Sequence, residues 1–481
     1  MTAQKLAGLE PASVLGYFEK ICSIPHGSGN TKQISDYLVS FAEEQGLRYI
    51  QDELNNVILF APGTEGYEDH EPVILQGHMD MVCEKDADCE IDFALDGLDV
   101  THDGEWIFAK GTTLGGDDGI AVAYALAILA DKTIPHPPLE VIITVDEETG
   151  MDGAVGIDLS MLKGKRLVNL DSEEEGIFTV SCAGGARATV KMDTPRHAVY
   201  GPCIRLTVDG LAGGHSGVEI DKNRANANKV MGEFLDEIKK LMPLCLTALS
   251  GGSKDNAIPR TCTASLVAMG MDLEPINDIA AKLQEKIRTT YAEPEAIVTA
   301  DNIDALGGNA LSTKDTDRII GLLCSAPNGV QAMCADMPEL VQTSLNLGIA
   351  KLDAEGFMMT FSVRSSVNQE KLDLLKRLSD MAYMYDCSFD ERGHYPAWEY
   401  KADSELRQIM VSTYREMFKA EPQVIAIHAG LECGLLGEKI QGLDSVSIGP
   451  DMQDIHTSRE RLNIASVGRM WKYLLELLKN M

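Results

Sequence analysis

The sequence lacks several features that would assign it to a particular class of protein. Its eleven cysteines are dispersed from Cys22 to Cys433 without a C-x-x-C pair, which excludes a regular disulfide framework and indicates reduced thiols. No basic segment followed by an apolar one opens the chain, so we expect no signal peptide. The longest apolar run, around Ala121–Ala130, is far shorter than the roughly 20 residues needed to cross a bilayer. These absences together predict a cytoplasmic protein.

Basic residues are scarce relative to acidic ones. Lysine and arginine number 42 against 74 aspartates and glutamates, which gives a formal net charge of -32. A surface of this sign repels nucleic acid and anionic membranes, so we expect neither as a partner. A cation as ligand fits this negative charge better. The excess of acidic residues is also explained if it only keeps the protein in solution.

The order of apolar segments predicts an α/β domain that is split by an inserted domain. Over residues 1–185, apolar runs typical of strands alternate with helical stretches, the pattern of a sheet covered by helices. Residues 186–398 contain further strands and amphipathic helices, which indicate a separate α+β unit. The α/β alternation resumes over residues 399–481. We therefore predict one domain built from the two outer segments and a second domain between them.

Histidine and acidic residues follow four of the predicted strands. These strands are expected at Val73–Leu75, Val141–Val145, Leu167–Leu170 and Ser445–Ile448. The residues beyond their carboxyl ends are His78 with Asp80, Glu147 with Glu148, Asp171, and His456. A fifth position, Asp117, lies in the glycine-rich segment TLGGDDG before a predicted helix. Because the carboxyl ends of the strands form the ligand crevice of an open α/β sheet, we expect these side chains to converge.

The convergent residues form a mixed set of nitrogen and oxygen ligands. Two histidines and three or four carboxylates, without cysteine, suit zinc with a water ligand, or manganese or cobalt. His78 and Asp80 lie two apart in extended chain, so one can bind a metal while the other orients it. Each motif alone is common on solvated loops, but their shared position after strands predicts a metal site.

The same segments resemble the zinc-dependent exopeptidases, the family that includes carboxypeptidase G, aminoacylase and carnosinase, and among them the aminoacyl-histidine dipeptidases. The similarity covers nearly the whole chain, in the stretches LQGHMDMV, GTTLGGDDGIAVAYALAIL, TVDEETGMDGA, LVNLDSEEEG, GGHSGVEIDKNRANANKV, GGSKDNAIPR, FSVRSS, HAGLECG and SIGPDMQDIHTSRERL. One departure is Ser458, where the family usually has proline. The resemblance implies a catalytic domain with a central mixed sheet flanked by helices, and an inserted α+β lid.

The resemblance also implies a role for each residue of the metal site. Two Zn²⁺ ions per subunit are expected, with Co²⁺ or Mn²⁺ as alternatives. Their ligands would be His78 and Asp171 at one position, Glu148 and His456 at the other, and Asp117 at both. Glu147 would be the general base of catalysis, and Asp80 would hold His78.

Further roles are implied for the inserted domain. It would form a homodimer, and its His215 would reach the active site of the other subunit. Arg364 would bind the carboxylate of the substrate, with contributions from Asn256 and the loop at Gly430. These four residues are the expected substrate-binding set.

The activity implied is hydrolysis of dipeptides, of the Xaa-His type, β-alanyl-histidine or a broader range, by a water that two zinc ions activate. Two activities of the same fold stay open: deacylation of N-acyl amino acids and removal of single residues from longer peptides. A different class is a metal-binding scaffold that has lost catalysis. Such a protein would lack a metal ligand or the general base, and none of these residues is missing. A phosphoesterase would need a basic phosphate clamp, which is not evident around the motifs.

Overall fold

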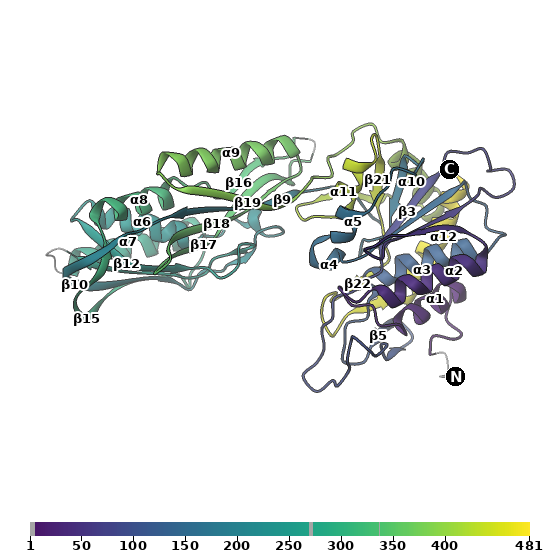
Figure 1. Cartoon of the computed structure of the whole chain (residues 1–481), viewed down its shortest axis with the longest axis horizontal. Helices are drawn as coiled ribbons and strands as arrows, with labels where there is room; N and C mark the ends of the chain where they lie inside the picture. The colour runs from purple at the N-terminus through teal and green to yellow at the C-terminus, as the bar shows by residue number, and fades with distance from the viewer. Residues whose placement is uncertain (1–4, 269–272, 336) are drawn as a thin grey trace. The chain divides into compact units, whose positions relative to one another are not determined.

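In the computed structural model, residues 5–268, 273–335 and 337–481 are described. They divide into two units (Figure 1). The first unit is made of Met1–Ser181, Tyr400–Ala426 and Leu431–Met481, and the second of Cys182–Glu399 and Ile427–Gly430. The first unit is therefore made of three separate segments of the chain, and the second unit of two.

One short segment near the C-terminal part of the chain belongs to the second unit. Residues 400–426 belong to the first unit, whereas residues 427–430 pack with the second unit. There the main-chain N–H of Ala183 donates to the oxygen of Ile427 at 3.2 Å, and Nε2 of His428 lies 2.7 Å from Oγ of Ser344. The chain therefore crosses between the units four times rather than twice.

The sheet of the first unit is mixed, with strand order β1-β2-β6-β3-β7-β21-β8-β20. The bounds are β1 Arg48–Gln51, β2 Val57–Ala61, β3 Val73–His78, β6 Leu139–Thr144, β7 Arg166–Asn169, β8 Ile177–Cys182, β20 Gln423–Ile427 and β21 Asp444–Ser447. β6, β3, β7 and β21 run parallel, whereas β2 and β8 are antiparallel to their neighbours. The carboxyl ends of the four parallel strands therefore meet at one edge.

Helices flank this sheet, which confirms the predicted fold class. They are α1 Ala12–Cys22, α2 Lys32–Gln45, α3 Gly116–Ala130, α4 Glu147–Gly150, α5 Asp152–Gly156, α10 Glu405–Phe418, α11 Glu432–Lys439 and α12 Ile464–Lys479. α3 is buried along almost its whole length, because it consists of small and apolar residues after Asp118 and packs against both α1 and β3. A small separate sheet has the order β22-β23-β5-β4, with bounds Met452–Gln453, Arg461–Asn463, Trp106–Ala109 and Val100–His102.

The second unit is built on an antiparallel sheet with the order β15-β10-β14-β12-β17-β18-β9-β19, to which β16 adds beside β17. Its strands are β9 Gly184–Met192, β10 Arg196–Asp209, β12 Leu244–Gly251, β14 Cys262–Ala268, β15 Ile297–Leu311, β16 Gly329–Met333, β17 Val341–Asp353, β18 Gly356–Ser365 and β19 Ser388–Tyr395. The helices are α6 Ala227–Lys239, α7 Glu274–Thr290, α8 Thr313–Ser325 and α9 Asn368–Met384. Short elements are β11 Gly214–His215, η1 Ile220–Lys222 and β13 Ala257–Ile258.

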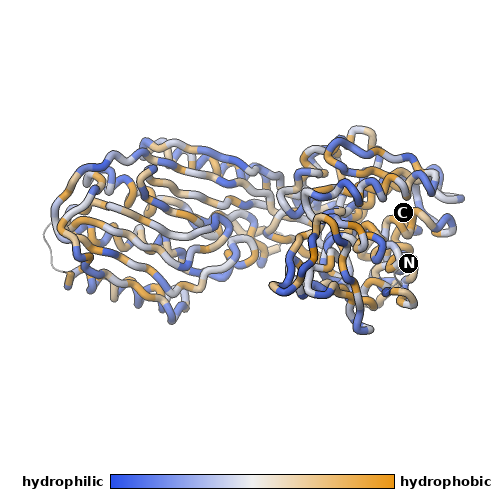
Figure 2. Tube along the Cα trace, turned by 60° about the horizontal axis from the view of Figure 1, so that its bottom comes forward, coloured by the Kyte–Doolittle hydropathy of each residue, from blue (hydrophilic) through white to orange (hydrophobic). Residues whose placement is uncertain are grey.

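Each unit has its own hydrophobic core. One cluster of buried side chains joins α1, α2, α3 and α12 to the first sheet. Another cluster joins the four helices α6, α7, α8 and α9 to the second sheet. Figure 2 shows hydrophobic and hydrophilic residues alternating along the strands and helices of both units. Among the described residues, no helix is both long enough and apolar enough to cross a membrane.

Candidate metal centre

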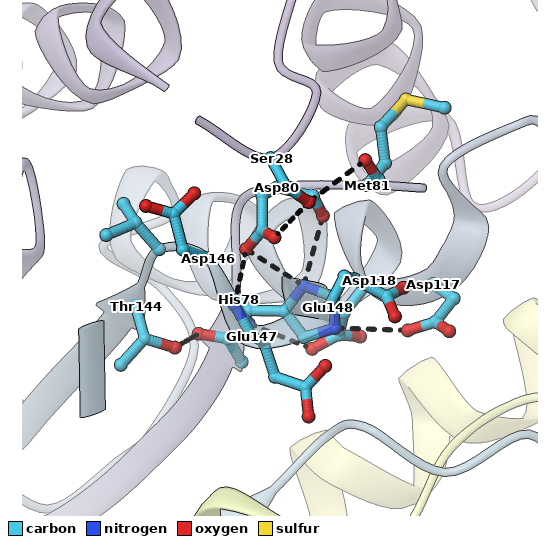
Figure 3. Close-up of polar contacts among 12 residues, drawn as sticks. Ser28, His78, Asp80, Met81, Asp117, Asp118, Thr144, Asp146, Glu147 and Glu148 are labelled. Carbon is cyan, nitrogen blue, oxygen red and sulfur yellow. Dashed lines mark hydrogen bonds and ion pairs between the residues drawn. The ribbon is translucent and has the colours of Figure 1, made fainter. Parts of the chain in front are cut away.

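Three neighbouring parallel strands deliver most of the expected site residues. His78 is the last residue of β3, Glu147 and Glu148 open α4 directly beyond β6, and Asp171 lies two residues beyond β7. Because β6, β3 and β7 are adjacent and parallel, their carboxyl ends bring these side chains together. Figure 3 shows His78, Glu147 and Glu148 close to one another. Asp117 joins them from the first turn of α3, where its backbone is not helical.

Asp117 lies between the two expected histidine ligands. Its Oδ1 is 3.1 Å from Nε2 of His78, and its Oδ2 is 3.1 Å from Nε2 of His456. Nε2 of His78 also lies 3.6 Å from Oδ1 of Asp171. Nε2 of His456 also lies 2.9 Å from Oε1 of Glu148. The structure therefore brings all five expected ligands into two groups that share one carboxylate.

The ring of His78 is oriented by Asp80. Nδ1 of His78 lies 3.0 Å from the main-chain oxygen of Asp80 and 3.5 Å from its Oδ1, so the ring proton belongs on Nδ1. Nε2 is then left with a lone pair for a metal, facing Asp117.

The carboxylate of Asp80 is fixed from two further directions. Ser28 donates its hydroxyl to Oδ2 at 2.8 Å, and the N–H of Glu147 donates to Oδ1 at 3.2 Å (Figure 3). Burial alone would raise the pKa of Asp80, but His78 and these two donors outweigh it and lower the pKa. Asp80 therefore links the loop between α1 and α2, which carries Ser28, to β3 and α4.

Negative charge is concentrated at the centre. Burial raises the pKa of Glu147 to about 9, and the carboxylates of Asp171, Glu432 and Glu148 add to this effect against the opposing influence of His78. Burial also raises the pKa of Asp171 to about 6, although its contact with His78 lowers it. Carboxylates held this close in a buried site are stabilised by cations.

The donor atoms fit metal ions in position as well as in charge. Three sets of side chains each place their ligand atoms within 4.8 Å of one another: His78, Asp118 and Asp171; His78, Glu147 and Glu148; and Asp117, Glu148 and His456. Imidazole nitrogen with carboxylate oxygen is a donor set that zinc, manganese and cobalt accept. The residues present therefore suit two ions.

Asp118 belongs to the centre although the sequence did not single it out. Its side chain is fully buried, and Oδ2 accepts the main-chain N–H of His78 at 3.2 Å. A Cβ at Gly77 would collide with Asp118 and Ala121, so this glycine lets α3 approach β3 closely. The resemblance already implied Asp117 as the shared residue, and the geometry adds that the adjacent Asp118 supports β3.

Glu432, in the motif HAGLECG, is a second residue that sequence reasoning missed. It opens α11 and is fully buried, and its Oε2 accepts from Nε2 of Gln76 at 2.6 Å and from the hydroxyl of Thr144 at 2.7 Å. Gln76 in turn accepts from Asn169 at 2.6 Å. The network joins the ends of β6, β3 and β7, beyond which lie the expected metal ligands.

His215 lies in the second unit. The N–H groups of Gly217 and Val218 donate to its Nδ1 at 3.2 and 3.4 Å, which places the ring proton on Nε2. Burial and the charge of Arg364 lower the pKa of His215. The ring is therefore a neutral donor at neutral pH.

The other expected substrate-binding residues also lie in the second unit. Arg364 and Asn256 line one pocket of about 340 Å³, and Asn256 also lines a second pocket of about 730 Å³ together with His215. Nη1 of Arg364 lies 3.3 Å from the hydroxyl of Tyr395. Gly430 belongs to the same unit, two residues after His428.

A profile of peptidase family M20/M25/M40 matches residues 74–480. The chain belongs to this family. Peptidases are hydrolases, so the expectation of a hydrolytic enzyme is confirmed.

Two relatives show where this M20 family chain stands. It is 38% identical over 479 residues to the cytosol non-specific dipeptidase of Escherichia coli K12, covering 99% of both chains. It superposes on the crystal structure of the aminoacylhistidine dipeptidase of Vibrio alginolyticus with a TM-score of 0.94 and 36% identity, covering 99% of this chain and 98% of the other. The resemblance to aminoacyl-histidine dipeptidases is therefore confirmed. A tripeptidase of Staphylococcus aureus, at 16% identity and a TM-score of 0.56, shares the fold.

The position of Asp117 predicts that its loss disables both metal positions. In Asp117→Ala, His78 and His456 lose the carboxylate between them, so both ions should bind more weakly, not one alone. Metal analysis after dialysis measures this, with Asp131→Ala at the exposed far end of α3 as the control. Two tightly held ions in Asp117→Ala would contradict a shared ligand.

Proposed function

We propose that this chain is a dipeptidase with two metal ions, which cleaves a broad range of dipeptides including Xaa-His. The observation that carries the proposal is the contact of one carboxylate, Asp117, with both His78 and His456. The relatives named above, a non-specific dipeptidase and an aminoacylhistidine dipeptidase, support the substrate class. The cytosolic relative and the eleven free cysteines support a location in the cytoplasm.

The ions are proposed to be Zn²⁺, held by His78 and Asp171, by Glu148 and His456, and by Asp117 in common. When bound, such ions polarise the scissile carbonyl and lower the pKa of a water molecule. Two doubly charged cations offset the carboxylates of the centre, which explains how so many acidic groups can remain buried.

Glu147 is proposed to be the general base. Of the two adjacent glutamates, Glu148 contacts His456, which leaves the Glu147 carboxylate for the substrate side. The N–H of Glu147 donates to Asp80, so its backbone is anchored to the residue that orients His78. Glu147 would take a proton from the attacking water and deliver it to the leaving amine, a contribution of about 10²- to 10⁴-fold in rate.

The carboxylate of the substrate is proposed to bind in the 340 Å³ pocket of the second unit. Arg187, Arg364 and Arg392 line this pocket, and Asp255 pairs with Arg187. Arg187 and Arg392 stand directly opposite each other on β9 and β19, a like-charge pairing that costs stability in a sheet. An anion held there offsets this cost in a chain that is otherwise strongly acidic.

His215 is proposed to act on the reacting carbonyl of the partner subunit in a homodimer. Its Nε2–H is a donor suited to an oxygen that gains negative charge. The second unit also offers apolar surface at one side of its sheet: Leu306 on the edge strand β15 is 82% exposed, and Tyr200 on the neighbouring strand β10 is 81% exposed. Exposed apolar residues on an edge strand are typical of a protein interface.

A substrate panel tests the proposed activity. Xaa-His dipeptides, β-alanyl-histidine, other dipeptides, a tripeptide and N-acetyl amino acids would be assayed with metal-stripped and zinc-reconstituted enzyme. We expect dipeptides to be cleaved only after reconstitution. Preferential cleavage of N-acetyl amino acids or of the tripeptide would instead favour the deacylase or exopeptidase activities of the same fold.

Substitution of the proposed base separates chemistry from metal binding. Glu147→Gln removes the proton acceptor but none of the five proposed ligands, so metal content should match wild type while kcat falls by about 10²-fold or more. Metal analysis and turnover on the best dipeptide measure both. If the variant loses stoichiometric metal, the roles of Glu147 and Glu148 are exchanged.

Mixed dimers test whether His215 acts in the partner's site. A dimer of one His215→Ala chain and one Glu147→Gln chain would contain one site with both residues intact and one site with both defects. Activity should reappear from two nearly inactive parents, at up to about half of the wild-type rate per mixed dimer if the sites are independent.

Differently tagged chains allow the mixed dimers to be isolated before the assay. Confirmed mixed dimers that stay as inactive as their parents would show that His215 acts within its own chain or has no catalytic role.

A further inference from the structure

A fully enclosed carboxylate holds the segment that presents Asp117. Glu460 is 3% exposed, and it accepts hydrogen bonds from four consecutive main-chain N–H groups. The donors are Leu114 at 2.8 Å, Gly115 at 3.1 Å, Gly116 at 2.7 Å and Asp117 at 3.3 Å. Consecutive N–H groups at a helix start form a concave anion site, and here a side chain of the same protein fills it.

The glycines of TLGGDDG make this contact possible. Gly115 has a φ of +68°, in the left-handed region, and a Cβ there would approach Sδ of Met81 to 2.9 Å. A Cβ at Gly116 would stand 3.2 Å from both Oε1 of Glu460 and Sδ of Met452. A larger residue at either position would push the loop away from the carboxylate.

Glu460 also lies on the loop that carries His456, one of the two histidines that contact Asp117. His456 stands four residues earlier in that loop, between β22 and β23, and it contacts Asp117 and Glu148. Within the loop, the N–H of Glu460 donates to the oxygen of Thr457 at 3.1 Å. The hydroxyl of Ser458, at the position where the family usually has proline, donates to Asp86 at 2.5 Å. One short loop therefore places both His456 and, through Glu460, the backbone of Asp117.

We propose that Glu460 is a positioning residue of the metal centre, which sets the place of Asp117 and so the affinity for both ions. This inference rests on the proposed two-metal function. Glu460 touches neither ion nor substrate in this account. Glu460 acts through the main chain of Leu114–Asp117. Asp117 and Glu460 are 343 residues apart in sequence.

Glu460→Gln is the direct test. The amide keeps the size of the side chain but offers one accepting oxygen in place of two, and its NH₂ would face donors. Loss of a group that orients a ligand lowers metal affinity by about 10- to 100-fold, and we expect a loss of this size at both positions. The measurement is competition for zinc with a chelator, together with the number of ions bound and the melting temperature of the metal-free protein.

Glu140→Gln is the matched control. Glu140 is also a buried carboxylate of the first unit, and it accepts the N–H groups of Lys163 and Gly164 at 2.9 to 3.1 Å. It stands near the amino end of β6, whereas the centre is at the carboxyl end. Both variants should melt at lower temperature without metal, but only Glu460→Gln should bind zinc more weakly. High zinc should restore kcat to Glu460→Gln with KM for the dipeptide unchanged.

Gly116→Ala supplies a second variant should Glu460→Gln fail to fold. It leaves the carboxylate in place but crowds it, and it should weaken both ions in the same assay. If Glu460→Gln binds two ions with wild-type affinity, the inference about Glu460 is wrong, but the proposed metal centre is not affected. If only Gly116→Ala folds, the same result in that variant has the same meaning. A wild-type chain that binds fewer than two ions would overturn the proposed centre together with the inference about Glu460.

Discussion

The repulsion among carboxylates at the edge of one sheet is the constraint on which the rest of the structure depends. Five acidic side chains meet two imidazoles there: Asp117, Asp118, Glu147, Glu148 and Asp171 with His78 and His456. Such a cluster needs cations and a rigid frame. Three residues outside the expected ligand set supply part of the frame: Asp80 contacts His78, Glu432 accepts hydrogen bonds from Gln76 on β3 and Thr144 on β6, and Glu460 accepts the N–H of Asp117.

Much of that frame comes from the part of the chain that follows the second unit. Glu432 and Glu460 both lie beyond residue 430, and so does His456. The strands and loops before residue 182 supply most of the ligands, but they are locked together by groups that arrive after the long excursion through the second unit. The two outer segments must therefore fold against each other before the centre is complete.

The sequence predicted the parts of the site that depend on local pattern. Apolar runs predicted β3, β6, β7 and β21, and the side chains expected beyond β3, β6 and β7 lie together because these parallel strands share an edge. His456 reaches the same place from the loop between β22 and β23. Roles that depend on contacts between distant segments could not be read in this way. Nothing in the sequence shows that Glu460 binds main-chain N–H groups more than 340 residues away. The choice of Asp117 as the residue shared by both histidines came from the family resemblance and not from the local pattern. The crossing of residues 427–430 into the second unit likewise follows from packing alone.

The most direct test of the account is to locate metal in crystals of the protein grown with zinc, using anomalous scattering at the zinc edge. The account predicts two peaks per chain, both in contact with Asp117, one beside His78 and Asp171 and the other beside His456 and Glu148. A single peak, or two peaks that do not share Asp117, would contradict it.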